Sequence, residues 1–153
     1  MMKIILGSDH LGFELKEIIK QHIQSKGLEV TDIGVYDKSP VDYPDIGLAL
    51  AERVSRGDYD RGILICGTGI GMAIVANKVP GVRAAQCHDV YSAERARKSN
   101  DAQIMTMGAL VVGTELAKKL VDVWLESEFQ GGRSLPKVEK INKIDVKYRC
   151  KVE

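Results

Sequence analysis

Short apolar runs alternate with amphipathic stretches along nearly the whole chain, and this alternation limits the possible folds more than any other feature. Five runs have the length and composition of β-strands: residues 3–6, 28–33, 61–66, 82–87 and 103–107. Strands that alternate with helices pair in parallel through right-handed crossovers. The run Gly62-Ile63-Leu64-Ile65 is apolar on both faces, as in a central strand. We predict an α/β fold, a three-layer α/β/α sandwich around a five-stranded parallel Rossmann-like sheet.

The stretches between these runs have the periodicity of amphipathic helices. In the first stretch four apolar residues recur at helical spacing: Leu15, Ile18, Ile19 and Ile23. Gly27 follows them and suits the position after a helix end. Pro44 suits the first turn of a second helix, which is predicted to end near Arg56. Further helices are predicted to end at residue 78 and to span residues 91–98 and 114–127.

The tail of the chain is predicted to form a last helix over residues 137–148. Val138, Ile141, Ile144 and Tyr148 share one side of that helix, and the opposite side is mostly lysine. We expect this tail to pack on a neighbouring subunit. The whole chain has 153 residues, a length that favours a single domain spanning residues 1–153.

The overall charge and hydropathy exclude several classes of partner. Lys and Arg number 22 and Asp and Glu 21, so the chain lacks the basic excess of a nucleic-acid binder. No stretch approaches the ~20 apolar residues that a membrane span needs. The apolar run at the N-terminus is too short for a signal peptide, so we expect a cytoplasmic protein without membrane contact.

Three cysteines, Cys66, Cys87 and Cys150, form neither a CxxC pair nor an even set. Disulfide frameworks and zinc sites use more cysteines or paired spacing. We expect reduced thiols and no metal.

Chemistry-bearing residues lie beside the predicted strands, and ligands of such sheets bind outside the carboxyl ends of the strands. Asp9-His10 follows the first strand, and Ser99-Asn100-Asp101 comes just before the fifth. The most informative segment is Cys66-Gly67-Thr68-Gly69-Ile70-Gly71, which follows the third strand. Its glycines leave backbone N–H groups exposed at the start of a helix, a combination that binds anions.

Other glycine-rich loops fit this segment less well. A dinucleotide fingerprint has GxGxxG after the first strand, and a P-loop ends in Gly-Lys-Ser/Thr, whereas this loop reads GxGxG after the third strand. A purely structural glycine turn remains an alternative. Cys66 favours chemistry, because a helix N-terminus beside a thiol favours the thiolate. Cys87, inside the fourth strand, is predicted to be an inert core residue. A base beside an oxyanion pocket is what proton abstraction from carbon requires.

Several motifs together resemble one enzyme family. They are Asp9-His10, Asp42-Tyr43-Pro44, the segment from Ile65 to Gly71, Ala76-Asn77-Lys78, Asn100-Asp101-Ala102 and Gly131-Gly132-Arg133. In these motifs, and over nearly the whole chain, the sequence resembles the family of ribose-5-phosphate isomerase B and the galactose-6-phosphate isomerases. The resemblance implies an aldose–ketose isomerase that uses no metal or other cofactor and acts as a homodimer or homotetramer with active sites shared between chains.

The resemblance also implies a role for individual residues. Cys66 would move a proton between sugar carbons 1 and 2, and Thr68 would assist proton movement among the oxygens. The enediolate oxygen would be held by the backbone N–H groups of Gly67, Gly69, Ile70 and Gly71. The sugar hydroxyls would be bound by Asp9, Tyr43 and Asn100. The phosphate would be held by His10 and Arg133, with Lys137 where the family usually has arginine.

The sequence departs from this family at specific positions. Many relatives have a histidine at the position of Ser99, which opens the furanose ring, and a serine hydroxyl is a poor acid or base. Leu110 stands where a phosphate-binding arginine is common, and Ser134 replaces a frequent histidine. Lys137 binds phosphate as a point charge, without the fork of an arginine. Either His88, after the fourth strand, takes over ring opening, or the enzyme captures an open-chain form, or the pocket suits another sugar.

We therefore expect interconversion of ribose 5-phosphate and ribulose 5-phosphate, in carbohydrate metabolism through the pentose phosphate pathway. A six-carbon substrate, allose 6-phosphate or galactose 6-phosphate, is the first alternative. A weakly active sugar-phosphate-binding subunit is the second, although the presence of Cys66, Thr68 and Asp9 argues against it. A nucleotide-binding module fits the fold but lacks the fingerprints.

Overall fold

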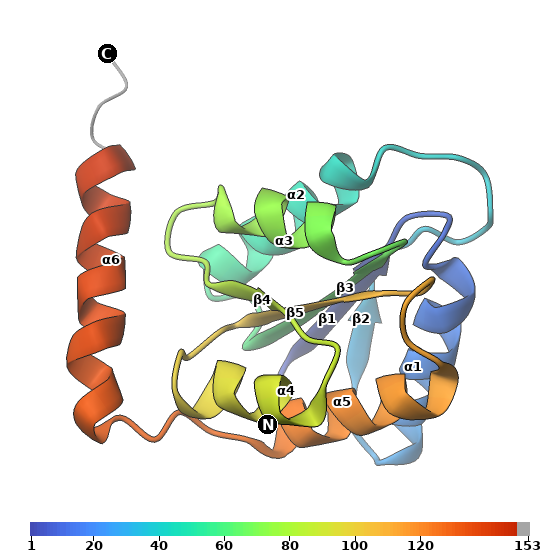
Figure 1. Cartoon of the computed structure of the whole chain (residues 1–153). Helices are drawn as coiled ribbons and strands as arrows, with labels where there is room; N and C mark the ends of the chain where they lie inside the picture. Colours follow the sequence, from blue (N-terminus) through green and yellow to red (C-terminus); the bar gives the residue numbers. More distant parts are fainter. Residues whose placement is uncertain (150–153) are drawn as a thin grey trace.

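The computed structural model describes residues 1–149, which form a parallel sheet between two layers of helices (Figure 1). The strands are β1 (Ile4–Ser8), β2 (Val30–Asp32), β3 (Arg61–Cys66), β4 (Ala84–Gln86) and β5 (Ile104–Gly108). The helices are α1 (Phe13–Ser25), α2 (Tyr43–Ser55), α3 (Ile70–Asn77), α4 (Val90–Lys98), α5 (Thr114–Glu126) and α6 (Leu135–Arg149), with a 3₁₀ turn at Gly132–Ser134. The strand order is β2-β1-β3-β5-β4, with every pairing parallel. The predicted fold class is confirmed.

The two faces of β3 pack against different helices, because successive side chains of a strand point to opposite sides. Ile63 and Ile65 join a buried cluster with side chains of α1, α4 and α5. Leu64 and Cys66 join a second cluster with α2 and α3 on the other face. Figure 1 shows these two helical layers above and below the sheet. Every residue of β3 is buried, as the doubly apolar run predicts for a central strand.

The edge strands are shorter than the sequence predicts. β2 covers only residues 30–32 of the predicted run 28–33, and β4 covers only 84–86 of 82–87. Each of these strands pairs with one neighbour only, β2 with β1 and β4 with β5. Very short edge strands are common in native sheets, because they leave few unpaired N–H and C=O groups for another chain.

The tail helix α6 matches the predicted helix at residues 137–148, with two further residues at its start and one at its end. Figure 1 shows it standing apart from the two helical layers, beside β4. Of the apolar side predicted for it, Val138 is buried, but Ile141, Ile144 and Tyr148 are exposed. Beyond Val138, polar contacts link the helix to the body, and Asp145 accepts a hydrogen bond from the Gly81 N–H at 2.7 Å. Among residues 1–149, no helix is long and apolar enough to cross a bilayer.

The strand register shows at which edge of the sheet each loop lies. Cys66 pairs with Gly108 at the carboxyl edge, where β1 also ends, whereas Gly62 pairs with Ile104 at the amino edge. The segment Ser99–Asp101, which precedes β5, therefore lies toward the amino edge. In Figure 1 the arrow of β3 points away from α6, so the tail helix also lies toward that edge.

Candidate active site

Cys66 is the last residue of β3 and only 4% exposed. Its Sγ accepts a hydrogen bond from the N–H of Gly69 at 3.1 Å. Gly69 is the residue that caps the start of α3, so the sulfur lies at the positive end of that helix. A donated N–H and a helix N-terminus both favour negative charge at such a position.

Gly69 is required by its surroundings. Its φ is +76°, and a Cβ there would lie 2.8 Å from the carbonyl carbon of Met107 on β5. Its carbonyl oxygen accepts a hydrogen bond from Thr106 Oγ1 at 2.8 Å. The Gln86 side chain donates to the carbonyl of Thr68 at 2.7 Å. The neighbouring strands β4 and β5 thus hold the loop through two side chains that sequence reasoning missed, Gln86 and Thr106. A polar threonine inside the buried strand β5 was the available signal.

The backbone N–H groups of the loop divide into occupied and unoccupied donors. The N–H of Gly69 is used by Cys66 Sγ, and that of Ile70 donates to Thr68 Oγ1 at 3.2 Å. The N–H groups of Gly67, Thr68 and Gly71 have no acceptor among residues 1–149. Three donors beside the thiol are consequently open to an anionic oxygen.

Tyr43 lies against this loop, as the first residue of α2. A Cβ on Gly71 would come within 2.4 Å of the Tyr43 Cζ, so the absence of a side chain at Gly71 makes room for the phenol ring. The ring is partly exposed. Its hydroxyl, together with the open N–H groups of the loop, lines the same part of the carboxyl edge.

Asp9 and His10 reach this edge from the end of β1. Asp9 is buried, its Oδ1 accepts from the Gly12 N–H at 3.0 Å, and its own N–H donates to Ile65 O at 3.2 Å. Those two bonds anchor the loop beside the last residues of β3. His10 Nδ1 accepts a hydrogen bond from the Val41 N–H at 3.2 Å, which orients the ring and leaves Nε2 for a ligand.

Leu110 lines the edge next to the glycine loop. Its Cδ1 would lie 3.4 Å from a Cβ on Gly67, and the Cδ1 of Leu11 would lie 3.2 Å from the same atom. Leu110 is 73% exposed. Leu110 therefore presents an apolar surface beside the loop and cannot bind a phosphate.

His88 follows β4 and lies beside the end of β5. Its Nε2 accepts a hydrogen bond from the Gly108 N–H at 3.0 Å. Because that nitrogen accepts, the proton of the neutral ring is on Nδ1. One nitrogen of His88 is thus used by the backbone, and its role in ring opening stays a prediction. Cys87, its neighbour, is fully buried, and burial raises the pKa of its thiol to about 12, as expected of an inert core residue.

Four of the predicted site residues lie away from Cys66 in the same chain. Ser99 and Asn100 precede β5 at the amino edge, and Arg133 and Lys137 are exposed on the turn and first residues of α6. β5 has five residues, which separates the two edges by ~16 Å. One chain therefore does not bring all predicted residues together.

Ser99 is held by a neighbour on its own helix. Its Oγ accepts hydrogen bonds from Arg95 Nε at 2.9 Å and from Arg95 Nη2 at 2.6 Å. Both serine lone pairs are then occupied, and only the hydroxyl proton remains for a ligand. Arg95, Asn100 and Gln86 line a cavity of ≈ 470 Å³ beside β4.

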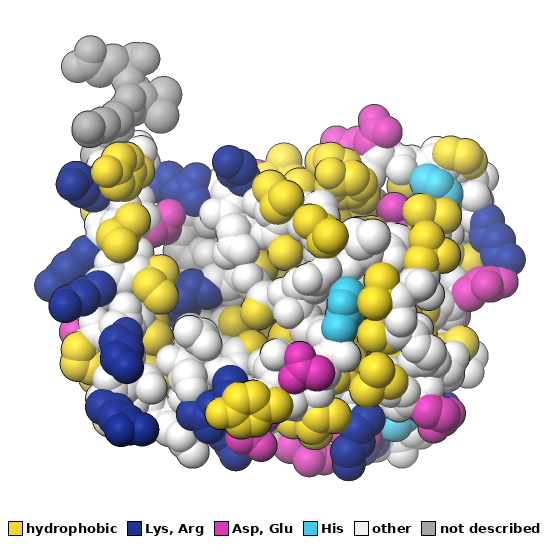
Figure 2. Space-filling model, in the orientation of Figure 1, with side chains coloured by type: hydrophobic (Ala, Val, Ile, Leu, Met, Phe, Trp, Pro, Cys, Tyr) yellow, Lys and Arg dark blue, Asp and Glu magenta, His cyan; other side chains and the backbone are white. Residues whose placement is uncertain are grey.

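Within residues 1–149, no three His, Cys, Asp or Glu side chains are grouped so that they could hold a metal ion. Basic side chains instead gather on α6, where Lys and Arg line the outer side of the helix in Figure 2.

Comparison with known proteins shows similarity over nearly the whole chain. Residues 4–141 match the family model described as Ribose/Galactose Isomerase. "Ribose-5-P isomerase B" of Listeria innocua is 58% identical, with 97% of this chain and 100% of the relative covered. "D-erythrulose-4-phosphate isomerase" of Pectobacterium atrosepticum is 56% identical, over 92% of this chain and 93% of the relative. The solved structure of ribose-5-phosphate isomerase B from Clostridium thermocellum is 52% identical with a TM-score of 0.94, covering 96% of this chain and 99% of that one.

Proposed function

This chain belongs to the ribose/galactose isomerase family, whose relatives are sugar-phosphate isomerases, and we propose that it interconverts ribose 5-phosphate and ribulose 5-phosphate with Cys66 as the base. One observation carries the proposal. The Cys66 sulfur lies beside a loop with three backbone N–H groups that have no acceptor in the described residues. A proton acceptor next to unoccupied oxyanion donors is the arrangement that enolisation requires.

The proposed reaction proceeds through an enediolate. The Cys66 thiolate takes the proton from carbon 2 of the open-chain aldose, and the C–H electron pair forms the C1–C2 double bond. The carbonyl electrons move to oxygen 1, whose negative charge is held by the N–H groups of Gly67 and Gly71. Oxygen 1 gains a proton and oxygen 2 loses one, with Thr68 Oγ1 as the relay. The Cys66 thiol then returns its proton to carbon 1, which gives the ketose.

The family resemblance implies the remaining roles, and the residues concerned divide between the two edges of the sheet. Asp9 and Tyr43 bind sugar hydroxyls and His10 binds the phosphate, all from the carboxyl edge that holds Cys66. Asn100 precedes β5 at the other edge, ~16 Å away, and Arg133 and Lys137 lie at the start of the tail helix. We propose that these three residues act in the site of a second copy of the chain, in a homodimer or a tetramer built from such dimers.

A mixing experiment tests the shared site. Cys66→Ala and Arg133→Ala chains should each be nearly inactive at low substrate concentration. Co-refolded together, they should recover roughly a quarter of wild-type activity, because half of the dimers are mixed and each mixed dimer has one intact site. Sites contained within single chains would give no recovery beyond the sum of the two parents. Sedimentation velocity on the mixture verifies that dimers have formed.

Ser99 favours a second candidate, the interconversion of erythrose 4-phosphate and erythrulose 4-phosphate. A pentose 5-phosphate closes into a furanose through its free oxygen 4, and the ring must be opened before carbon 2 can lose its proton. In a four-carbon 4-phosphate, oxygen 4 is esterified, so that ring cannot form. A site with Ser99 clamped by Arg95, rather than a histidine, suits a substrate that needs no ring opening. The Pectobacterium atrosepticum relative carries the name of such an isomerase.

A substrate panel tests these alternatives with excess chelator present. Ribose 5-phosphate is expected to turn over, whereas activity lost to chelator would contradict a metal-free reaction.

Ser99→His should raise kcat/KM for ribose 5-phosphate about tenfold, because an imidazole can shuttle the ring-opening proton. It should leave erythrose 4-phosphate unchanged, since that sugar has no ring to open. Equal gains on both substrates would exclude ring opening as the cause. If wild-type enzyme turns over only erythrose 4-phosphate, the second candidate is established. If it turns over only allose 6-phosphate or galactose 6-phosphate, the substrate is a six-carbon sugar phosphate.

A further inference from the structure

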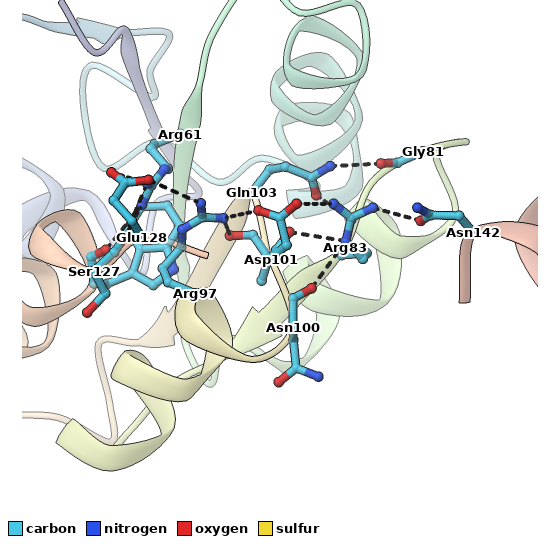
Figure 3. Close-up of polar contacts among 12 residues, drawn as sticks. Arg61, Gly81, Arg83, Arg97, Asn100, Asp101, Gln103, Ser127, Glu128 and Asn142 are labelled. Carbon is cyan, nitrogen blue, oxygen red and sulfur yellow. Dashed lines mark hydrogen bonds and ion pairs between the residues drawn. The ribbon is translucent and has the colours of Figure 1, made fainter. Parts of the chain in front are cut away.

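The segment before β5 is held in an unusual backbone conformation. Asp101 has a φ of +49°, the left-handed region that residues other than glycine seldom adopt. Its carboxylate lies between two arginines, 3.1 Å from Arg97 Nη1 and 3.1 Å from Arg83 Nη2 (Figure 3). Such a conformation persists where surrounding contacts over-determine it, and it often marks a functional segment.

Arg83 makes the contacts that concern Asn100 directly. Its Nε donates to the backbone carbonyls of Asn100 at 3.2 Å and Asp101 at 3.1 Å. Its Nη1 donates to Asn142 Oδ1 on α6 at 2.8 Å. The guanidinium therefore joins the start of β4, the Asn100 backbone and the tail helix. In Figure 3 the amide of Asn100 points away from this network, so Arg83 fixes the backbone and leaves the side chain to bind a ligand.

Two buried arginines lie near this segment, and one of them, Arg97, bonds to it directly. Arg97 is 6% exposed, and its Nη1 donates to the Ala102 carbonyl at 2.8 Å. Arg61 is equally buried and pairs with Glu128 at 3.0 Å. Burial, and then the charge of Arg97, lower the pKa of Arg61. Charged groups are costly to bury, and part of that cost is offset by the bonds of Arg97 to this segment and of Arg61 to the end of α5.

We propose that Arg83 is a positioning residue, which holds the backbone of Asn100 so that its amide reaches the sugar in the site of a second copy. The proposal rests on the proposed function, which assigns Asn100 to a sugar hydroxyl. Through Asn142 the same guanidinium makes the position of Asn100 depend on the docking of α6. The site then gains its full affinity only when the tail helix is in place.

A double-mutant cycle tests this role with ribose 5-phosphate. Asn100→Ala should raise KM about tenfold with little change in kcat, as expected for the loss of one binding hydrogen bond. Arg83→Met should raise KM by a similar factor. The double variant should match Asn100→Ala alone, because Arg83 acts only through Asn100. Asn142→Ala should raise KM about threefold, since it removes one of the contacts that hold the guanidinium.

The matched control is Arg56→Met, which removes an exposed arginine whose hydrogen-bond partner is Asp58 and should leave KM unchanged. If Arg83→Met does not fold, Asp101→Asn takes its place. It keeps a residue that tolerates the left-handed conformation but removes the carboxylate charge. The inference would be overturned if the rise in KM of the double variant equalled the product of the two single rises. An unchanged KM in Arg83→Met would overturn it as well. An unchanged KM in Asn100→Ala would overturn it together with the assignment of Asn100. These outcomes leave the proposed reaction itself intact. Only activity that persists in Cys66→Ala would contradict it.

Discussion

Replacing Cys66 with alanine should lower kcat for ribose 5-phosphate about 10³-fold while KM stays within about twofold. The sulfur is proposed to remove the proton from carbon 2, and no other group in the described loop is placed to do so. Gly69 N–H donates to this sulfur, and the N–H groups of Gly67 and Gly71 stay open for the oxyanion. Steady-state kinetics measure the loss. Exchange of the carbon 2 hydrogen with deuterated solvent, followed by NMR, reports on proton removal alone.

The control for Cys66 is the second buried thiol, Cys87. Its pKa is raised to about 12 by burial, and its side chain packs in the opposite cluster, with α4 and α5. Cys87→Ala should lower stability slightly and leave kcat unchanged. Deuterium exchange at the wild-type rate in Cys66→Ala would show that another group removes the proton. The isomerase reaction would then need a different base.

Gly69→Ala should lower kcat about 100-fold, a large effect for the addition of one methyl group. The new Cβ would lie 2.8 Å from the Met107 carbonyl carbon, a distance that real Cβ atoms essentially never show, and the φ of +76° disfavours alanine as well. The loop must then move away from β5. That movement displaces the N–H that donates to Cys66 and the open donors beside it. Kinetics measure the loss of kcat, and thermal unfolding measures the accompanying fall in stability.

Gly57 provides a control with the same backbone conformation. Its φ is +80°, and a Cβ there would meet nothing within 4 Å. Gly57→Ala should therefore show only the conformational penalty, about 1–2 kcal/mol of stability, with kcat unchanged. An equal loss of kcat in both variants would mean that general destabilisation, not displacement of the loop, causes the effect. Wild-type kcat in Gly69→Ala would contradict the proposed oxyanion donors.

Much of the fold could be predicted from local patterns. The apolar runs and helical periodicities identify five strands and the helices between them, because a helix that is buried on one face has apolar residues at regular spacing in the sequence. The family could be predicted too, and the match over residues 4–141 confirms it. The edge strands were predicted too long, since pairing with one neighbour is a tertiary property that no local run records.

The candidate site was predictable only in part. Asp9, His10 and Cys66 were expected at one edge, because the carboxyl ends of parallel strands meet there, and the structure places them so. Ser99 and Asn100 were grouped with them as residues beside a strand. Because they precede β5, they lie at the opposite edge of the sheet. The contacts of Arg83 with Asn100 and with α6 join residues 17 and 59 positions apart, beyond the reach of any local pattern.

The amino-acid sequence by itself determined the kind of fold and the position of Cys66 beside a run of glycines, because these features depend on composition and short-range spacing. The tertiary structure alone decided which donors remain open and why Gly69 cannot carry a side chain. Both properties depend on the position of β5 beside β3, because this position puts the Met107 backbone against the loop. Strand order is set by how helices and sheet pack as a whole, so contacts across strands are absent from the linear pattern.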